Sequence, residues 1–272
     1  MRQRSITVLC DNTALPGLSC EWGLAMAVDL GGEAGLWLWD TGQTALFAAN
    51  AAKLGVDLAA ARGLALSHGH YDHTGGVGAL LAAGFRGGIH AHPGCTRERY
   101  AREPEGRPPR TVGPPRPLPE FHSAGPVTPL APGLTLVTDI PRAPGSFQSV
   151  EGFSYDRGGQ EPDHVPDDAF LALESTSGPV IILGCCHSGL GNSLAAARER
   201  LGLGRIHAVL GGLHLVKAGR SAVEETAQAV REFGVERLVI GHCTGPKRLP
   251  ELAMLLPDTQ VVPLASGFRI RF

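Results

Sequence analysis

Residues 67–76 read Ser67-His68-Gly69-His70-Tyr71-Asp72-His73-Thr74-Gly75-Gly76, with three histidines and one aspartate in six consecutive positions. The segment follows a short apolar stretch at residues 64–67, which we expect to be a strand. Neutral imidazole and carboxylate groups suit divalent zinc, iron or manganese. In an extended turn His68 and His70 point to the same side, and Asp72 and His73 can reach a second position nearby. The spacing therefore predicts a metal site with room for two ions.

The flanking sequence predicts strands and one helix on each side of this segment. Residues 24–30 and 35–39 read as two strands joined by Gly31-Gly32-Glu33, which favours a hairpin. Residues 45–54 have helical spacing and stop at Gly55, a suitable C-cap. We also expect strands at residues 5–11 and 88–91 and a helix at 76–83.

The second half of the chain alternates strands and helices. Helices are predicted at residues 193–201, 221–233 and 247–256, each bounded by Gly or Pro. Strands are predicted at 170–174, 180–183, 207–210, 238–240 and 260–263. Such alternation indicates layered sheets covered by helices. Because both halves begin with hairpin-like strands, we expect two packed sheets within a single domain spanning residues 1–272.

Residues 104–133 have a different composition. Ten of these thirty positions are proline, and no helical or alternating period runs through them. Proline lacks the N–H that a ladder or helix needs, so we expect an irregular surface excursion here. Basic residues gather around it and could hold a phosphate through forked contacts. They are Arg97, Arg99, Arg102, Arg107, Arg110 and Arg116.

Composition excludes several classes of protein. The 272 residues carry a net charge of −2, which gives no electrostatic basis for binding nucleic acid or an anionic membrane. The longest apolar runs fall short of the ~18 residues of a membrane helix, and no signal peptide is evident. The six cysteines include the adjacent pair Cys185 and Cys186, a poor disulfide framework. We therefore expect reduced thiols in a cytoplasmic protein that acts on a small molecule. The oligomeric state is not defined by these features.

The ordered motifs resemble those of the metallo-β-lactamase superfamily, whose signature is HxHxDH after an apolar strand, preceded here by Asp40-Thr41-Gly42. The resemblance implies a four-layer αββα sandwich of two mixed β-sheets, with a metal site at one sheet edge. It covers most of the chain and is greatest for a subgroup that includes a dihydropterin ribofuranosyl-aminobenzene 5'-phosphate synthase. The shared motifs are Leu9-Cys10-Asp11-Asn12, Trp22-Gly23-Leu24, Ile140-Pro141-Arg142, Gly184-Cys185-Cys186-His187-Ser188-Gly189, Gly211-Gly212-Leu213-His214-Leu215 and His242-Cys243-Thr244-Gly245.

The resemblance also implies ligands for two divalent ions, with zinc expected and iron or manganese as alternatives. His68 and His70 match the first metal position, Asp72 and His73 the second, and His242 the final histidine of the superfamily. Together with His187, these residues complete the expected set: His68, His70 and His187 for one ion, and Asp72, His73 and His242 for the other.

His187 enters this set because the chain departs from the superfamily at two places. Ile140-Pro141-Arg142 stands where most members have another histidine, and residues 184–187 stand where they have a bridging aspartate. His187 is our candidate for the missing imidazole, and the bridging carboxylate stays unassigned. Cys185 could supply a sulfur ligand, but we favour its interpretation as a small buried apolar residue.

Four residues are candidates for catalysis or substrate binding. Asp72 has a second role in orienting a nucleophilic water, and His214 follows a strand where it could act as an acid or base. Asn12 and Arg142 lie in segments that, by resemblance, face the site and could contact substrate.

Three functions follow from this combination. The first is a metal-dependent hydrolase that uses a metal-bound hydroxide on a small phosphorylated metabolite, since a divalent ion lowers the pKa of bound water towards ~7. The second is a synthase-like transferase that releases diphosphate. The third is a non-catalytic protein that binds a metal or ligand, because a fold does not fix a function.

Overall fold

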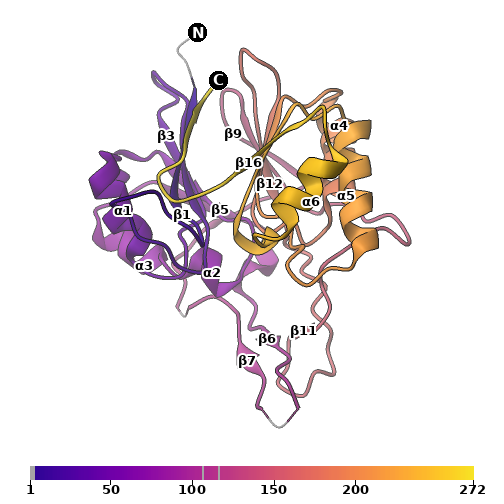
Figure 1. The fold of residues 1–272 in the computed structure, drawn as a ribbon. Helices are drawn as coiled ribbons and strands as arrows, with labels where there is room; N and C mark the ends of the chain where they lie inside the picture. Colours follow the sequence, from indigo (N-terminus) through magenta and orange to yellow (C-terminus); the bar gives the residue numbers. More distant parts are fainter. Residues whose placement is uncertain (1–3, 106, 116) are drawn as a thin grey trace.

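Two seven-stranded sheets face each other and carry helices on their outer sides in the computed structural model (Figure 1), which describes residues 4–105, 107–115 and 117–272. The expected four-layer αββα architecture is confirmed. No helix of these described residues is long and apolar enough to cross a membrane.

The first sheet has the strand order β17-β1-β2-β3-β4-β5-β8. Strands β2 and β3 form the predicted antiparallel hairpin, whereas β3, β4, β5 and β8 run parallel. The strands are β1 (Ser5–Cys10), β2 (Ala25–Asp29), β3 (Leu36–Trp39), β4 (Gly63–Ala65), β5 (Gly88–Ala91), β8 (His122–Ser123) and β17 (Arg269–Arg271).

The second sheet has the order β16-β15-β14-β13-β12-β10-β9. Its strands β13 to β16 are parallel, and their connections include the helices that cover its outer face. The strands are β9 (Val127–Ala131), β10 (Leu134–Val137), β12 (Phe170–Leu173), β13 (Val180–Leu183), β14 (Ala208–Gly211), β15 (Arg237–Ile240) and β16 (Gln260–Pro263).

Helices lie close to their predicted positions. Helix α1 (Leu46–Leu54) ends at Gly55, which has the left-handed φ of 70° expected of a C-cap. Helix α4 (Leu190–Leu201) starts three residues before its predicted start at residue 193. The others are α2 (Tyr71–Thr74), α3 (Val77–Ala82), α5 (Arg220–Glu232) and α6 (Arg248–Leu255), with short 3-10 turns at Leu58–Ala60, Pro93–Thr96 and His242–Thr244.

Apolar side chains fill the space between the sheets and beneath both helical layers. Met26 and Trp39 of the first sheet belong to the same buried cluster as Leu171 and Ile182 of the second. Helix α5 buries Val223 and Val230 on one face, the spacing of an amphipathic helix. The hydrophobic effect thus holds the two sheets face to face, and it fixes the edges at which their loops meet.

The proline-rich segment is more regular than its composition predicts. Strands β7 (Arg110–Thr111), β8 and β9 begin within residues 104–133, and β7 joins β6 (Tyr100–Ala101) and β11 (Phe153–Ser154) in a small third sheet. This sheet projects from the sandwich as an arm (Figure 1). Proline fits here because Pro129 lies in β9, an edge strand, where one side of the backbone needs no partner. Residue 106 and Arg116 lie outside the described residues.

Candidate metal centre

The histidine-rich segment forms a tight turn between β4 and α2. The Gly69 N–H donates to Asp167 Oδ2 at 2.8 Å, and a Cβ on Gly69 would lie 2.1 Å from the Cys95 carbonyl oxygen. Only glycine allows so close an approach. The turn brings the rings of His68 and His70 to a centroid distance of 4.6 Å, in line with the predicted common side.

Three buried imidazoles form the first group of ligand-type side chains. One ring nitrogen from each of His68, His70 and His187 lies within 4.8 Å of the others. His187 Nδ1 lies 2.6 Å from the Ser149 carbonyl oxygen, and Nε2 of His70 and of His187 are buried without a hydrogen-bond partner among the described residues. Burial is the main cause that lowers the pKa of all three rings. Neutral rings with free buried nitrogens fit a divalent ion.

Asp72, His73 and His242 form the second group. Asp72 Oδ2 lies 3.5 Å from His242 Nε2 and 3.9 Å from His73 Nε2. The Nδ1 atoms of the two histidines contact other residues: His73 Nδ1 lies 2.6 Å from Asp40 Oδ2, and His242 Nδ1 lies 3.0 Å from Asn12 Oδ1. Such outer contacts orient imidazoles so that their Nε2 atoms face the site.

The two histidines of this group have opposite pKa shifts. Burial alone lowers the pKa of His73, but the carboxylates of Asp40 and Asp72 outweigh it and raise the pKa to about 9. His242 has no such close carboxylate pair, and burial lowers its pKa. Without an ion, therefore, His73 is the protonated member of the group.

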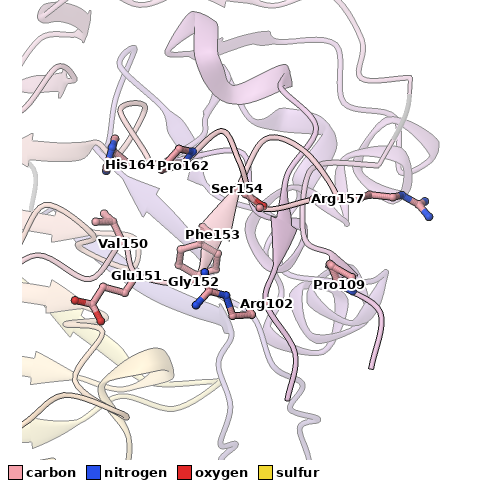
Figure 2. A pocket seen from close by; sticks show the side chains of 12 residues that line it. Arg102, Pro109, Val150, Glu151, Gly152, Phe153, Ser154, Arg157, Pro162 and His164 are labelled. Atoms are coloured by element: carbon pink, nitrogen blue, oxygen red, sulfur yellow. The ribbon is translucent and has the colours of Figure 1, made fainter. Parts of the chain in front are cut away.

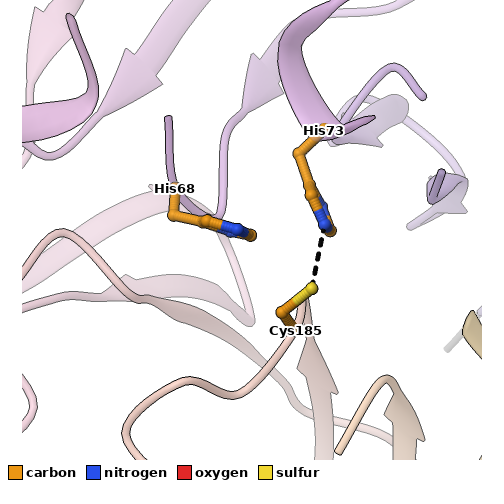
Figure 3. A group of neighbouring side chains, drawn as sticks. All are labelled: His68, His73 and Cys185. Atoms are coloured by element: carbon orange, nitrogen blue, oxygen red, sulfur yellow. Dashed lines mark hydrogen bonds between the residues drawn. The ribbon is translucent and has the colours of Figure 1, made fainter. Parts of the chain in front are cut away.

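The Cys185 thiol lies between the two groups. Its Sγ is 3.2 Å from His73 Nε2 and 3.3 Å from His242 Nε2, and it also forms a ligand-type group with His68 and His73 (Figure 3). Asp72 supplies the only carboxylate in the groups formed by the described residues. A thiol thus occupies the place where the superfamily pattern predicts a bridging carboxylate. The interpretation of Cys185 as a small buried apolar residue does not explain this position.

His214 lies beside the first group. Its ring centroid is 4.4 Å from that of His187, and one of its ring nitrogens lies within 4.8 Å of the thiols of Cys185 and Cys243. His214 Nδ1 is buried without a hydrogen-bond partner among the described residues. The structure therefore brings His214 to the site, as the sequence predicts.

Backbone strain gathers in the turns that carry these side chains. Six described non-glycine residues have a positive φ, and four of them follow strands at the site. They are Asp40 (56°), Cys186 (59°), His214 (47°) and His242 (48°). Residues in this region cost free energy unless the surroundings hold them, and they gather at functional sites.

Asn12 and Arg142, the two candidates for substrate contact, both form hydrogen bonds with neighbouring loops. The Asn12 side chain donates to the His242 carbonyl oxygen and accepts from the Gly23 N–H, so its polar atoms brace the second group. The Arg142 guanidinium contacts Ser188 Oγ at 3.2 Å and the Val165 carbonyl oxygen at 2.7 Å. Neither residue is among those that line the cavity at the site, and substrate contact stays a prediction for both.

A cavity of about 950 Å³ opens onto His70, Asp72 and His214. Other parts of its wall are aromatic or basic, and they include Arg102 and Arg110 from the basic group that the sequence offered for phosphate: Trp22, Tyr71, Phe147, Phe153, Arg102, Arg110 and Lys217. Glu103 and Glu151 line it as well. Figure 2 shows Arg102 beside Phe153 on the wall that this cavity shares with a smaller one of about 280 Å³. The arm thus forms one side of the approach to the metal centre.

Two buried carboxylates at the centre had no assigned role. Asp40 belongs to the Asp40-Thr41-Gly42 motif, so the sequence indicates its place near the site. The sequence does not predict its contact with His73. Asp167 contacts Gly69 across 98 positions of sequence. No local pattern marks such a pair.

This fold and this arrangement of histidines define the class of protein. The family described as the metallo-beta-lactamase superfamily matches residues 23–242, and the chain belongs to it.

Particular relatives narrow the comparison. The 7,8-dihydropterin-6-methyl-4-(beta-D-ribofuranosyl)-aminobenzene-5'-phosphate synthase of Methanocaldococcus jannaschii is 29% identical over 196 residues. That match covers 67% of this chain and 66% of the relative, just under two thirds of its length.

Two solved structures resemble the whole chain. Tm1679, described as a metal-dependent hydrolase of the beta-lactamase superfamily, has a TM-score of 0.84 and 28% identity, covering 99% of this chain and 98% of its own. The metallo-beta-lactamase fold protein YhfI from Bacillus subtilis has a TM-score of 0.61 at 13% identity, covering 99% of this chain and 100% of its own. The second likeness supports the fold alone.

Proposed function

We propose that the protein is a metal-dependent hydrolase that acts on a small phosphorylated metabolite. The observation that carries this proposal is the pair of buried ligand groups at one end of the cavity. Two of their imidazole nitrogens have no hydrogen-bond partner among the described residues. One divalent ion would be held by His68, His70 and His187, and the other by Asp72, His73 and His242.

Ions bound by these residues would supply Lewis-acid activation of water and would stabilise negative charge on a phosphoryl oxygen. Asp72 lines the cavity, and its carboxylate accepts a hydrogen bond from the attacking water and so orients it. His214 also lines the cavity and donates a proton from its ring to the leaving oxygen. Burial of the surrounding histidines excludes bulk water from the reacting centre.

The cavity wall supports a phosphorylated substrate. Arg102, Arg110 and Lys217 line it, and neither Arg102 nor Lys217 forms an ion pair with a carboxylate of the described residues. Guanidinium and ammonium groups with free donors bind phosphate readily. Zinc is the ion we expect, because the Cys185 thiol adjoins both groups and sulfur ligands favour zinc over manganese.

A second candidate is a transferase that joins two substrates with loss of diphosphate. The relative that is 29% identical and named as a synthase favours this alternative. The aromatic side chains on the cavity wall, Trp22 and Phe153 among them, suit a planar substrate as well as a phosphate ester.

Substitution of Asp72 tests the hydrolase. Metal content and turnover of the wild type and Asp72→Ala are measured on phosphomonoesters, phosphodiesters, thioesters and lactones. We expect at least two equivalents of zinc in the wild type, and a loss of turnover by about 100-fold or more in the variant, typical of a lost base.

Other outcomes separate the alternatives. Turnover only when a dihydropterin diphosphate and a ribosylated aniline are both supplied supports the transferase. Equal behaviour of wild type and Asp72→Ala on every substrate supports a non-catalytic binding protein. Less than one equivalent of metal in correctly folded protein contradicts all the metal-dependent functions.

A further inference from the structure

Two thiols and one imidazole meet on the cavity wall beside the His/Asp groups. The Sγ atoms of Cys185 and Cys243 and a ring nitrogen of His214 all lie within 4.8 Å of one another. Both cysteines are almost completely buried, at 2% and 1% exposure, and both are reduced. All three residues line the large cavity, so an ion can reach them from solvent.

The backbone around this cluster makes room for it. A Cβ on Gly212 would lie 2.5 Å from Cys243 Sγ, so glycine at this position leaves the space that the thiol occupies. His214 is held at a φ of 47°, a conformation that costs free energy for a residue with a side chain. Its Nδ1 is buried and has no hydrogen-bond partner among the described residues.

The donor set selects a particular class of ion. Two sulfurs and one imidazole nitrogen are typical of a tetrahedral zinc site with a fourth position left open for water or substrate. Thiolates also bind cadmium and cobalt, whereas magnesium, calcium and manganese prefer oxygen ligands. In this cluster the open position faces the cavity, since all three donors come from its wall.

We propose that Cys185, Cys243 and His214 form a third metal site, specific for a soft divalent cation such as zinc. The site shares no residue with the His68/His70/His187 and Asp72/His73/His242 groups, but it borders them, because its Cys185 thiol also neighbours His68, His73 and His242. An ion at this site would occupy a ring nitrogen of His214, which would then be a ligand and not the acid of the proposed hydrolysis. The ion site itself stands whether the enzyme is a hydrolase or a transferase.

Cobalt titration tests this site through a readout that is independent of activity. A cobalt–thiolate bond gives a charge-transfer band in the near ultraviolet, and cobalt on histidine and carboxylate gives none. We expect the wild type to bind three equivalents and to show this band. Cys243→Ser should lose roughly half of the band, because one of the two thiolates is gone, and should bind the third ion at least about tenfold more weakly. His214→Ala should bind the third ion at least about tenfold more weakly.

Cys186→Ser is the matched control. Cys186 is 1% exposed, adjacent to Cys185 in sequence, and its Sγ lies 3.6 Å from Ser193 Oγ, away from the cavity wall. This variant should keep the full band and three equivalents. Near- and far-ultraviolet circular dichroism establishes that each variant is folded. If Cys243→Ser does not fold, Cys243→Ala replaces it.

The remaining outcomes separate the third site from the proposed function. Two equivalents and no band in the wild type overturn the third site and leave the proposed function intact. A band that Cys185→Ser abolishes but Cys243→Ser and His214→Ala leave unchanged also overturns it, since Cys185 would then serve the His/Asp centre. A single equivalent with the thiolate band would support the sulfur site and contradict the two-ion function.

Discussion

Asp40 shows how much of the metal centre depends on residues that would not touch an ion. Its Oδ1 accepts from the Ser67 N–H at 2.7 Å, and its Oδ2 accepts from Ser67 Oγ at 2.7 Å and lies 2.6 Å from His73 Nδ1. All three residues are completely or almost completely buried. The carboxylate therefore fixes both the start of the histidine-rich turn and the orientation of His73.

Replacement of this carboxylate should change the pH dependence of stability in the metal-free protein. The pKa of His73 is raised to about 9 from its usual 6.5, so its pairing with Asp40 stabilises the fold fully below pH 6.5 and ceases to do so as the pH rises through 9. Asp40→Asn should lower the free energy of unfolding by about 3 kcal/mol at pH 6.5, since it breaks a buried pair. The difference from wild type should shrink towards pH 9.

Urea unfolding of the chelator-treated proteins between pH 6 and 9.5 measures this difference. His73→Gln is the partner variant, in which the added effect of Asp40→Asn should be smaller because the pair is already lost. A difference between wild type and Asp40→Asn that stays constant across this range would rule out the proposed charge on His73.

At the scale of elements, a buried arginine and two aspartates connect the arm to the histidine-rich turn. The Arg99 guanidinium is fully buried; its Nη2 donates to Asp167 Oδ1 at 2.6 Å, and its Nε lies 3.5 Å from Asp163 Oδ2. Asp167 alone also accepts the Gly69 N–H, between His68 and His70. Both aspartates are buried and pair with Arg99, but Asp167 lies closer to the guanidinium and is the one of the two that contacts the turn.

Asp167→Asn and Asp163→Asn should therefore separate positioning from simple charge loss. We expect Asp167→Asn to weaken zinc binding at the His68/His70/His187 group by about 10–100-fold, the usual effect of a lost outer contact. Asp163→Asn should have a much smaller effect on affinity even if it destabilises the fold equally. Competition with a chromophoric chelator measures affinity, and hydrogen exchange of residues 64–75 reports on the turn without any metal. Equal losses of zinc affinity in both variants would mean that the turn depends only on neutralisation of the Arg99 charge and not on the contact between Asp167 and Gly69.

At the scale of the whole molecule, the centre joins the two sheets. His68, His70, Asp72 and His73 follow β4 of the first sheet, while His187 follows β13 and His242 follows β15 of the second. Each proposed ion takes ligands from both sheets. Binding should therefore resist separation of the two halves of the sandwich, because an ion bound only by the folded chain stabilises it by mass action.

Metal removal should accordingly lower the thermal stability of the whole chain. We expect chelation to reduce Tm by on the order of 10 °C, from a few kcal/mol of binding free energy and the size of the domain. Calorimetry before and after chelation, with zinc restored as the reverse step, measures the change. His207→Ala is a suitable control, since this histidine pairs with Glu236 away from the centre and should keep the full response to zinc. An unchanged Tm in protein shown to have lost its metal would exclude ions that connect the sheets.

The local spacing of apolar residues predicted much of the secondary structure. The periods of apolar residues placed the hairpin at β2 and β3, helix α5 and the parallel strands β13 to β15 within a few residues, because side-chain spacing reflects which face is buried. The same pattern missed β10 and β17, and it missed the short strands of the arm, whose pairing depends on distant neighbours. Proline-rich sequence concealed strands that tertiary contacts at sheet edges permit.

The sequence by itself determined the superfamily, the order of the motifs and the identity of the histidines brought to the centre, since each lies in a short segment at a strand end. Only the tertiary structure decided what surrounds them. It set Cys185 between the groups, turned Asn12 and Arg142 to bracing roles, and joined Asp167 to Gly69. Ligand types are a local property of the chain, whereas the distances among them arise only when two sheets pack and bring separate strand ends together.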